Sequence, residues 1–487
     1  MTEQIPILDR IISRKREDLV SIKRERPLES FRQSIRPSTR SFSAALARPR
    51  PAIICEIKKA SPSKGVIRQD LDAAKVAAIY DLYADAVSVV TDGPFFSGSL
   101  DMLRQARTVT ALPILRKDFI IDPYQVYEAR DAGADAVLLI ASVLSSKEIT
   151  ELSALAASLG MDSLVEVHDT QDLDRAIEAD SKIVGINNRD LRTFEVDLEH
   201  TSRMAKLVPS GIIIVSESGM NSRSDICSLS DAAGAFLIGT TIMAADDIGQ
   251  RLSSLSSPRV KICGIADLTA GLCAAKAGAD MMGFVFEAKS PRNISPERAI
   301  GIIDGVNKAV PSCRTVGVFV DAEISTVVGT AKVVGLDMVQ LHGDEDEAYI
   351  ADIKDRLGLP VIKGLRIRDQ GDLDRIASCT ADIILLDAFS SESFGGTGKR
   401  VPLGILQEAI HDHPGKRIMI AGGISADNVH EVLTLSPYGV DVSSSLEISP
   451  GIKDGNLIYE FMETFLDSTK KADLKVMPNK STHRITV

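Results

Sequence analysis

The chain has 487 residues, a formal net charge of −11 and a pI near 5.3. Hydrophobic residues make up 44% and charged residues 25%, ordinary globular values that exclude a disordered, collagen-like or coiled-coil chain. The acidic balance argues against a general nucleic-acid or anionic-membrane binder, and the 4% of aromatic residues leave few stacking platforms for bases.

The six cysteines are scattered without the paired spacing of a zinc site or of a disulfide framework. The amino terminus soon becomes charged and lacks the apolar core of a signal peptide, and no uncharged apolar run approaches the roughly 18 residues of a membrane span. We therefore expect a cytoplasmic protein that uses no metal and contacts neither membrane nor nucleic acid.

Residues 1–50 precede the first predicted strand and contain a charged, helix-compatible stretch from Leu8 to Arg24. A solvated helical cap is the favoured interpretation of this extension. A lid over the mouth of the domain that follows is the alternative.

Short aliphatic runs, each followed by a segment with helical spacing, then recur along the chain. The first half contains eight such runs, at residues 53–57, 86–90, 113–117, 136–141, 163–167, 183–187, 212–216 and 235–239. The second half contains eight more, at residues 259–263, 281–286, 315–319, 337–341, 360–363, 383–387, 417–421 and 439–443. Continuous aliphatic runs are typical of parallel strands that are buried on both faces.

Eight strand and helix units in each half predict an α/β fold of two tandem (β/α)8 TIM barrels. A doubly wound open sheet would also alternate strands and helices, but it does not require eight units twice, and no GxGxxG follows the first strand. We place a first barrel domain at residues 1–255 and a second at 256–466, joined by a Ser-rich stretch at 251–258. Residues 467–487 are polar and aperiodic and are expected to be poorly ordered.

The carboxyl ends of the first eight strands are unusually polar, and such ends carry the catalytic groups of these barrels. They present Glu56 with Lys58, Lys117, Glu166, Asn187 with Arg189, and the run Ser216 to Gly219. Two lysines and two glutamates in one low-dielectric mouth shift one another's pKa values, which separates acid from base roles at neutral pH. The loops after the last two strands offer Gly219 and Gly239 for a phosphate, with simple tight turns as the alternative.

Five of these strand-end motifs resemble indole-3-glycerol-phosphate synthase over residues 1–255: Glu56-Ile-Lys58-Lys-Ala-Ser61, Leu115-Arg-Lys117-Asp-Phe, Glu166-Val-His, Gly185-Ile-Asn187-Asn-Arg189 and Ser216-Glu217-Ser218-Gly219. The resemblance implies cyclisation of 1-(2-carboxyphenylamino)-1-deoxyribulose 5-phosphate with loss of CO2 and water. It implies that Lys117 is the acid at the carbonyl oxygen, that Glu166 carries proton transfers with Lys58 as the competing acid, and that Glu56 orients the lysines. It assigns substrate binding to Asn187, Arg189 and Ser218, and phosphate binding to Ser61, Gly219, Gly239 and Thr240.

The second half presents a different set of strand-end residues. Cys263 closes the first strand just before a glycine, and Asp387 ends an Ile-Ile-Leu-Leu run. A thiol and a carboxylate facing each other across a barrel mouth make a plausible base and acid pair. Taken singly, Cys263 and His342 are more often a buried hydrophobe and a structural histidine. Glycines follow at residues 395, 396 and 398, and at Gly422 and Gly423.

These motifs resemble phosphoribosylanthranilate isomerase over residues 258–466. The resemblance implies an Amadori rearrangement of N-(5-phosphoribosyl)anthranilate, in which Asp387 protonates the ring oxygen and the Cys263 thiolate removes the C2 proton. It also implies that Arg292 binds the anthranilate carboxylate and that His342 shapes the site. Phosphate binding falls to Gly422, Gly423, Ser443 and Ser444. Two small departures from the family pattern stand near this site, Ala266 and Ser445.

The sequence therefore predicts a bifunctional enzyme of tryptophan biosynthesis, a lyase and an isomerase on one chain. The expected partners are small phosphorylated anthranilate derivatives, with no cofactor and no obligatory protein partner. The main alternative is an active synthase fused to a silent barrel that binds ligand or acts as a scaffold. Another phosphosugar isomerase on the second barrel is a weaker alternative, because it does not explain the pairing of Cys263 with Asp387.

Overall fold

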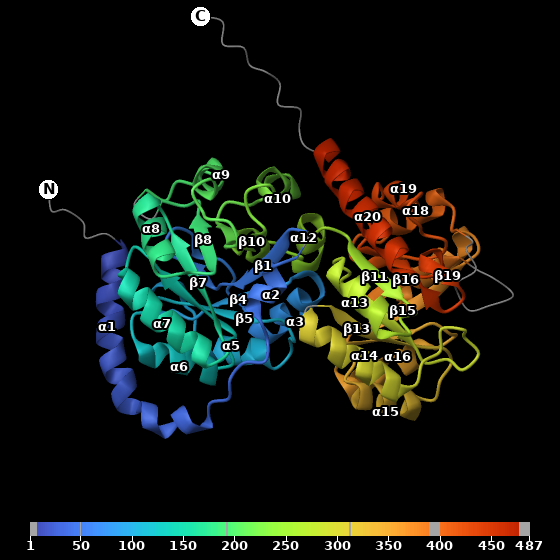
Figure 1. Cartoon of the computed structure of the whole chain (residues 1–487), viewed down its shortest axis with the longest axis horizontal. Helices are drawn as coiled ribbons and strands as arrows, with labels where there is room; N and C mark the ends of the chain where they lie inside the picture. Colours follow the sequence, from blue (N-terminus) through green and yellow to red (C-terminus); the bar gives the residue numbers. More distant parts are fainter. Residues whose placement is uncertain (1–6, 49, 191–192, 311–312, 389–399, 477–487) are drawn as a thin grey trace, which may run out of the picture. The chain divides into compact units, whose positions relative to one another are not determined.

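The structure is a computed structural model that describes residues 7–48, 50–190, 193–310, 313–388 and 400–476. Contacts divide the chain into two compact units, residues 1–256 and 257–487. Each unit contains a closed eight-stranded parallel barrel (Figure 1), which confirms the predicted pair of tandem (β/α)8 barrels. Within the described ranges, no helix is long and apolar enough to cross a bilayer. No group of three or more His, Cys, Asp or Glu in the same ranges is arranged to hold a metal ion.

The first barrel closes when its last strand pairs with its first. Its strands are β1 (Ala52–Ile57), β4 (Ala86–Val90), β5 (Ile114–Lys117), β6 (Ala136–Ile140), β7 (Asp162–Val167), β8 (Ile183–Asn187), β9 (Ile213–Glu217) and β10 (Ala235–Ile238). Around and before them lie α1 (Ile7–Glu25), α2 (Phe42–Leu46), α3 (Ala73–Tyr83), α4 (Gly93–Phe96), α5 (Leu100–Arg107), α6 (Pro123–Asp131), α7 (Ser146–Ser158), α8 (Thr170–Glu178), α9 (Glu199–Ala205), α10 (Arg223–Leu229), α11 (Thr240–Met243) and α12 (Ile248–Leu255). A short hairpin of β2 (Ala60–Ser61) and β3 (Gly65–Val66) follows β1.

The second barrel repeats this architecture with its own closing pair of strands. Its strands are β11 (Arg259–Cys263), β12 (Met281–Val285), β13 (Arg314–Phe319), β14 (Met338–Leu341), β15 (Val361–Ile367), β16 (Ile383–Ala388), β17 (Ile418–Ile420) and β18 (Gly439–Val442). Its helices are α13 (Leu268–Lys276), α14 (Pro296–Ala309), α15 (Ile324–Val334), α16 (Glu347–Leu357), α17 (Asp374–Ser378), α18 (Leu403–Asp412), α19 (Val429–Leu433) and α20 (Gly455–Val476). A hairpin of β19 (Glu447–Ser449) and β20 (Ile452–Lys453) follows β18.

The barrel strands are aliphatic because they are buried on both faces. All residues of β1, β4, β6, β8, β11 and β12 are buried. Side chains that point outward from the strands of the second barrel pack under the helices, with Phe284 and Phe319 among the largest. This two-sided burial is the physical reason why the strands could be recognised as continuous apolar runs.

The repeated Ala-Gly-Ala-Asp sequence performs the same structural task in both barrels. Gly133 and Gly278 have φ values of +100° and +98°, a left-handed conformation that ends the preceding helix. The aspartate that follows then accepts a hydrogen bond from a strand N–H, with Asp135 bound to Ile114 N and Asp280 to Val260 N, both at 2.9 Å. Arginines also pair with these buried carboxylates. Each copy therefore ends a helix and ties it to a neighbouring strand.

The carboxyl-terminal helix is longer than the sequence predicts. It runs to Val476, so residues 467–476 are helical and the expected disordered tail is wrong for this stretch. Phe461 and Phe465 of this helix are buried in the core of the second unit, and they anchor it. Residues 477–487 of the expected tail lie outside the described residues.

Candidate functional site

A cavity of about 600 Å³ opens at the carboxyl ends of the strands of the first barrel. It is lined by every residue that the sequence assigned to this half: Glu56, Lys58, Ser61, Lys117, Glu166, Asn187, Arg189, Ser218, Gly219, Gly239 and Thr240. These residues come from six strands and the loops that follow them, because parallel strands of a barrel end at the same rim. The cavity is the first candidate active site.

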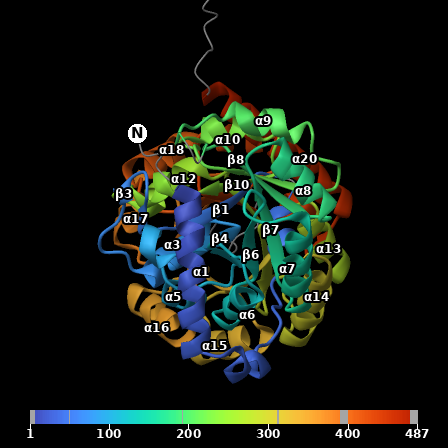
Figure 2. The ribbon, with the colours of Figure 1, turned by 90° about the vertical axis from the view of Figure 1, so that its left-hand side faces the viewer.

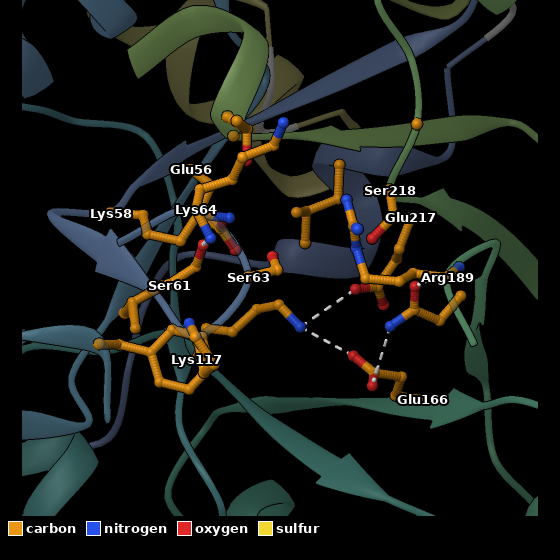
Figure 3. A pocket seen from close by; sticks show the side chains of 18 of the residues that line it. Glu56, Lys58, Ser61, Ser63, Lys64, Lys117, Glu166, Arg189, Glu217 and Ser218 are labelled. Carbon is orange, nitrogen blue, oxygen red and sulfur yellow. Dashed lines mark hydrogen bonds and ion pairs between the residues drawn. The ribbon is translucent and has the colours of Figure 1, made fainter. Parts of the chain in front are cut away.

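Lys117 lies at the centre of this cavity between two carboxylates (Figure 3). Its Nζ lies 2.8 Å from Glu166 Oε2 and 3.1 Å from Glu217 Oε2. Burial opposes the charge of the lysine, but the two glutamates outweigh it and raise the pKa of Lys117. Lys117 is therefore a firmly held ammonium group at neutral pH.

The two carboxyl groups that share Lys117 are driven to opposite protonation states. Burial raises the pKa of Glu217 to about 8, because the attraction of Lys117 only partly offsets burial and the charge of Glu166 adds to it. Burial acts on Glu166 in the same sense, but Lys117 and His168 outweigh it and hold the pKa of Glu166 well below its usual range. At neutral pH Glu166 is a carboxylate, and Glu217 carries a proton.

Glu217 was not predicted as a site residue, although it lies within the motif Ser216-Glu217-Ser218-Gly219 at the end of β9. The available signal was its position directly before Ser218, at a strand end where the other polar residues were taken as functional. Alternation of side chains along β9 sends Glu217 into the barrel. Only the structure shows that it meets Lys117.

His168 was also not predicted as a site residue, and it lies next to the Glu166 carboxylate. Its Nε2 lies 3.3 Å from Glu166 Oε1, and its Nδ1 lies 3.5 Å from Asp172 Oδ2. Burial disfavours the imidazolium, but the neighbouring carboxylates of Asp172 and Glu166 outweigh burial and raise the pKa of His168 to about 10. Glu166 therefore lies between two cations.

Glu56 and Lys58 form the second ion pair of the cavity, at 2.5 Å between Oε1 and Nζ. Gly239 packs directly on Glu56, since a Cβ at this glycine would lie 2.3 Å from Glu56 Oε1. The end of β10 can approach the carboxylate only because residue 239 has no side chain. The predicted link between Glu56 and a lysine is therefore present in the geometry.

Asn187 and Arg189 extend the site from β8. Asn187 donates from Nδ2 to Glu166 Oε1 at 3.3 Å, and its Oδ1 accepts from Arg189 N at 3.1 Å. The Arg189 guanidinium donates to the carbonyl of Phe194 at 3.0 Å. Across the cavity, Ser218 and Gly219 have φ values of +66° and +93°, so two successive left-handed residues turn the chain at the expected phosphate position.

Helix α1 lies across the first barrel, and its first residues line the cavity (Figure 2). Ile7, Leu8 and Ile11 contribute apolar wall. Lys15 is buried, and its Nζ lies 2.9 Å from Asp92 and 2.7 Å from Asp118. The solvated-cap interpretation is therefore wrong for this face of α1, and the lid interpretation fits the contacts.

The mouth of the second barrel holds the other predicted set. Cys263 ends β11 beside Lys261, whose buried Nζ lies 3.0 Å from both carboxylate oxygens of Asp441. A Cβ at Gly283 would lie 2.8 Å from Cys263 Sγ and 3.2 Å from Lys261 Cε, so the thiol and the lysine stem share one small space. Burial raises the pKa of the Cys263 thiol, and Lys261 opposes this effect. The predicted thiolate therefore depends on a cation that sequence reasoning did not assign.

Asp387 and His342 meet on the opposite side of this mouth. His342 Nε2 lies 3.3 Å from Asp387 Oδ2, while Gln340 Nε2 lies 3.0 Å from His342 Nδ1. Burial raises the pKa of Asp441, the charges of Lys261 and His342 oppose this rise, and the charge of Asp387 adds to it. The predicted acid and base are thus connected through one shared electrostatic cluster.

The predicted phosphate loops of the second barrel adjoin each other. Gly422 and Gly423 have φ values of +83° and +62°. The Ser443 hydroxyl donates to the carbonyl of Cys263 at 3.0 Å, and the Ser445 hydroxyl donates to the carbonyl of Ile424 at 2.5 Å. Ser445, one of the two departures, therefore ties the loop after β18 to the loop after β17. The glycines at 395–398 lie outside the described residues.

Comparison with known proteins identifies both halves of the chain. The family model for indole-3-glycerol phosphate synthase matches residues 8–255, and the model for N-(5'-phosphoribosyl)anthranilate isomerase matches residues 260–464. The tryptophan biosynthesis protein TrpCF of Salmonella typhi is 39% identical over 94% of this chain and 98% of its own length. TrpCF of Vibrio cholerae is 37% identical over 94% of this chain and 95% of its own length. A solved phosphoribosyl anthranilate isomerase from Thermotoga maritima is 34% identical over 43% of this chain and 98% of that chain, with a TM-score of 0.39.

Proposed function

This chain belongs to the family of the tryptophan biosynthesis proteins TrpCF, and from that premise we propose how its residues divide the two reactions between two sites. It is a bifunctional enzyme with an indole-3-glycerol-phosphate synthase domain and a phosphoribosylanthranilate isomerase domain. The match of the second half to an isomerase model favours an active isomerase over the silent barrel considered from the sequence. Each barrel has its own set of charged and polar residues at its strand ends, which supports one reaction per barrel.

In the first barrel, Lys117 is the acid that meets the substrate carbonyl oxygen as the aryl ring attacks. The observation that supports this role most strongly is the position of its ammonium group between Glu166 and Glu217 in the cavity. A cation that is already oriented in a low-dielectric site stabilises the developing oxyanion without reorganisation. The proton transfers that let the hydroxyl group leave as water then fall to Glu166, with Lys58 as the competing acid and Glu56 as the residue that orients the lysines.

The remaining residues of the first cavity bind substrate. Asn187, Arg189 and Ser218 hold the carboxylate and hydroxyl groups, while Ser61, Gly219, Gly239 and Thr240 hold the phosphate. The left-handed turn at residues 218 and 219 supports the phosphate role, since consecutive backbone N–H groups in such a turn make a concave anion site. Helix α1 closes over the bound substrate.

In the second barrel, Asp387 protonates the ring oxygen of N-(5-phosphoribosyl)anthranilate, and Cys263 removes the C2 proton of the resulting iminium. Lys261 supports this assignment, because a neighbouring ammonium group favours the thiolate form that the step requires. His342 orients Asp387. Gly422, Gly423, Ser443 and Ser444 hold the phosphate, and Arg292 holds the anthranilate carboxylate.

Both substrates are small phosphorylated anthranilate derivatives, and the product of the second barrel is the substrate of the first. The cytoplasmic location expected from the sequence stays a prediction.

Reciprocal variants of the full chain test this division. Cys263→Ala or Asp387→Asn should abolish isomerisation and leave the synthase rate intact, whereas Lys117→Ala should do the reverse. Each activity is measured with its own substrate, and the second activity of each variant shows that the chain is folded. A single substitution that removes both activities from a folded protein contradicts the assignment of separate sites.

A further inference from the structure

The hairpin β19–β20 carries two buried, oppositely charged side chains that have no role in the proposed reaction of either barrel. Glu447 and Lys453 are cross-strand partners in this hairpin. The Glu447 side chain is 4% exposed and that of Lys453 is 1% exposed. Burying two charges is costly unless their contacts compensate, so their partners reveal what the pair does.

Glu447 holds the guanidinium of Arg292 with both carboxylate oxygens. Arg292 Nε donates to Oε1 at 2.7 Å, and Nη2 donates to Oε2 at 2.8 Å. Such a fork fixes the plane of the guanidinium as well as its position. It uses two of the five N–H donors of the arginine and leaves the opposite edge for another anion.

Lys453 compensates the charge that Glu447 brings to this arginine. Its Nζ lies 2.6 Å from Glu447 Oε1 and donates to the Ser443 carbonyl at 3.0 Å. Two cations around one carboxylate leave the cluster with a net positive charge. Without Lys453, the carboxylate would cancel the charge that Arg292 offers to an anionic ligand.

Close packing holds the arginine loop against the hairpin. Gly451, with φ +86°, lies against this loop, since a Cβ there would lie 2.3 Å from the carbonyl oxygen of Pro291. On the other side, a Cβ at Gly264 would lie 2.6 Å from Arg292 Cδ. Ser443 connects the same hairpin to the base, because its hydroxyl donates to the Cys263 carbonyl. The hairpin thus contacts the arginine and the phosphate loop directly, and it is linked to the strand end that carries Cys263 through Ser443.

We propose that Glu447 and Lys453 are positioning residues of the isomerase: Glu447 fixes the plane of Arg292, and Lys453 preserves the net positive charge, so that Arg292 presents one oriented edge to the carboxylate of the anthranilate ring. This inference rests on the proposed role of Arg292 in carboxylate binding. Neither Glu447 nor Lys453 touches the reacting atoms in this arrangement.

Two competitive inhibitors of the isomerase test the proposal on the full chain. One probe is reduced 1-(2-carboxyphenylamino)-1-deoxyribulose 5-phosphate, and the other is the same molecule without the ring carboxylate. Their inhibition constants are measured against isomerase turnover in wild type, Glu447→Gln and Lys453→Met. Glu431→Gln, at an exposed carboxylate of the same unit, is the matched control, and thermal unfolding checks each variant.

We expect Glu447→Gln and Lys453→Met to raise the inhibition constant of the carboxylate probe by about 10-fold or more, which is the loss expected for a charge-assisted contact. The probe without the carboxylate should change by less than about 2-fold, and KM should rise more than kcat falls. Equal weakening of both probes would mean a merely structural role and would overturn the proposal. If wild type does not bind the carboxylate probe more tightly than the other probe, the proposed role of Arg292 in carboxylate binding is wrong, and the proposal for Glu447 and Lys453 is overturned with it. If Glu447→Gln does not fold, Lys453→Met decides alone, since it leaves the fork on Arg292 in place.

Discussion

The raised pKa of Glu217 predicts that this residue destabilises the first barrel at neutral pH. Its side chain is 2% exposed, and its pKa rises from the usual 4.5 to about 8. Between these two pH values the folded state holds a proton that the unfolded state has lost. Stability therefore falls as pH rises, by about 1.4 kcal/mol per pH unit. From pH 4.5 to pH 7 the cost amounts to about 3 kcal/mol.

Glu217→Gln should remove this cost, because glutamine has the shape of the protonated acid and never ionises. We expect the variant to be more stable than wild type by about 3 kcal/mol at pH 7, with a smaller gain at pH 5.5 and a larger one at pH 8. Its synthase activity should fall, since Lys117 loses an ionisable partner. A gain in stability with a loss in function is the usual signature of an active-site residue.

Scanning calorimetry of the full chain at three pH values measures this gain as the difference between variant and wild type. Contributions of the second unit cancel in that difference. Glu151→Gln is the control, since its side chain is 63% exposed on α7. A gain that does not change with pH, or a loss of stability at pH 8, would refute the reasoning, because either result means that Glu217 is charged in the folded state.

Three further substitutions test other buried charges. Lys15→Met should lower the free energy of unfolding by about 3 kcal/mol by calorimetry, because it leaves the Asp118 carboxylate without its partner on α1, and should raise KM of the synthase. His168→Gln should lower the free energy of unfolding at pH 6.5, and the loss should become progressively smaller towards pH 10. The reason is that the pKa of His168 is raised to about 10 in the folded state, so the stabilisation by its positive charge is lost as the pH rises through that value. An equal loss of stability across this pH range in calorimetry would mean that His168 is not charged in the folded protein. Lys261→Met should shift the rising limb of the isomerase pH profile upward by about one unit, because the Cys263 thiol loses the cation that lowers its pKa; an unchanged profile would mean that the lysine does not tune the thiol.

The sequence predicted the barrels well because their strands obey a simple physical rule. A strand covered by helices on one side and by the barrel interior on the other must be apolar throughout, so the run Ile183–Asn187 could be recognised without a partner. The ends of the strands were predicted less well: β15 extends to Ile367, beyond the predicted run at residues 360–363. Arg366 lies opposite Asp387 of β16 in the backbone ladder. Because Arg366 is charged, the apolar pattern of the sequence does not reveal that the strand continues through it.

Short elements outside the barrels escaped prediction for a different reason. The two strands of the β19–β20 hairpin contain only five residues, and Ile448 and Ile452 are exposed. The hairpin packs instead against a loop more than 150 residues earlier in the sequence. No local pattern encodes such a contact. The same holds for the extension of α20 past Asp467, where a few buried aromatic residues upstream anchor a polar helical end.

The sequence located the site residues but not their partners, and the partners determine the electrostatics. Strand-end position is a local property, which is why Lys117, Glu166, Cys263 and Asp387 could be chosen in advance. Whether a lysine meets one carboxylate or two depends on which strands adjoin in three dimensions.

This pairing also resolves how an acidic chain can bind anionic substrates. In each barrel a cation of the site is already held by carboxylates: Lys117 by two glutamates, Lys261 by Asp441 and Arg292 by Glu447. A cation held in this way is oriented before the substrate arrives, so binding does not have to order a long side chain. In the first barrel Lys117 and Glu166 cancel each other, so a net positive charge requires both the His168 imidazolium and a protonated Glu217. In the second barrel, Lys453 adds the further cation. The two barrels therefore keep a positive site by different means, and we expect only the first to lose that positive charge as the pH rises through 8.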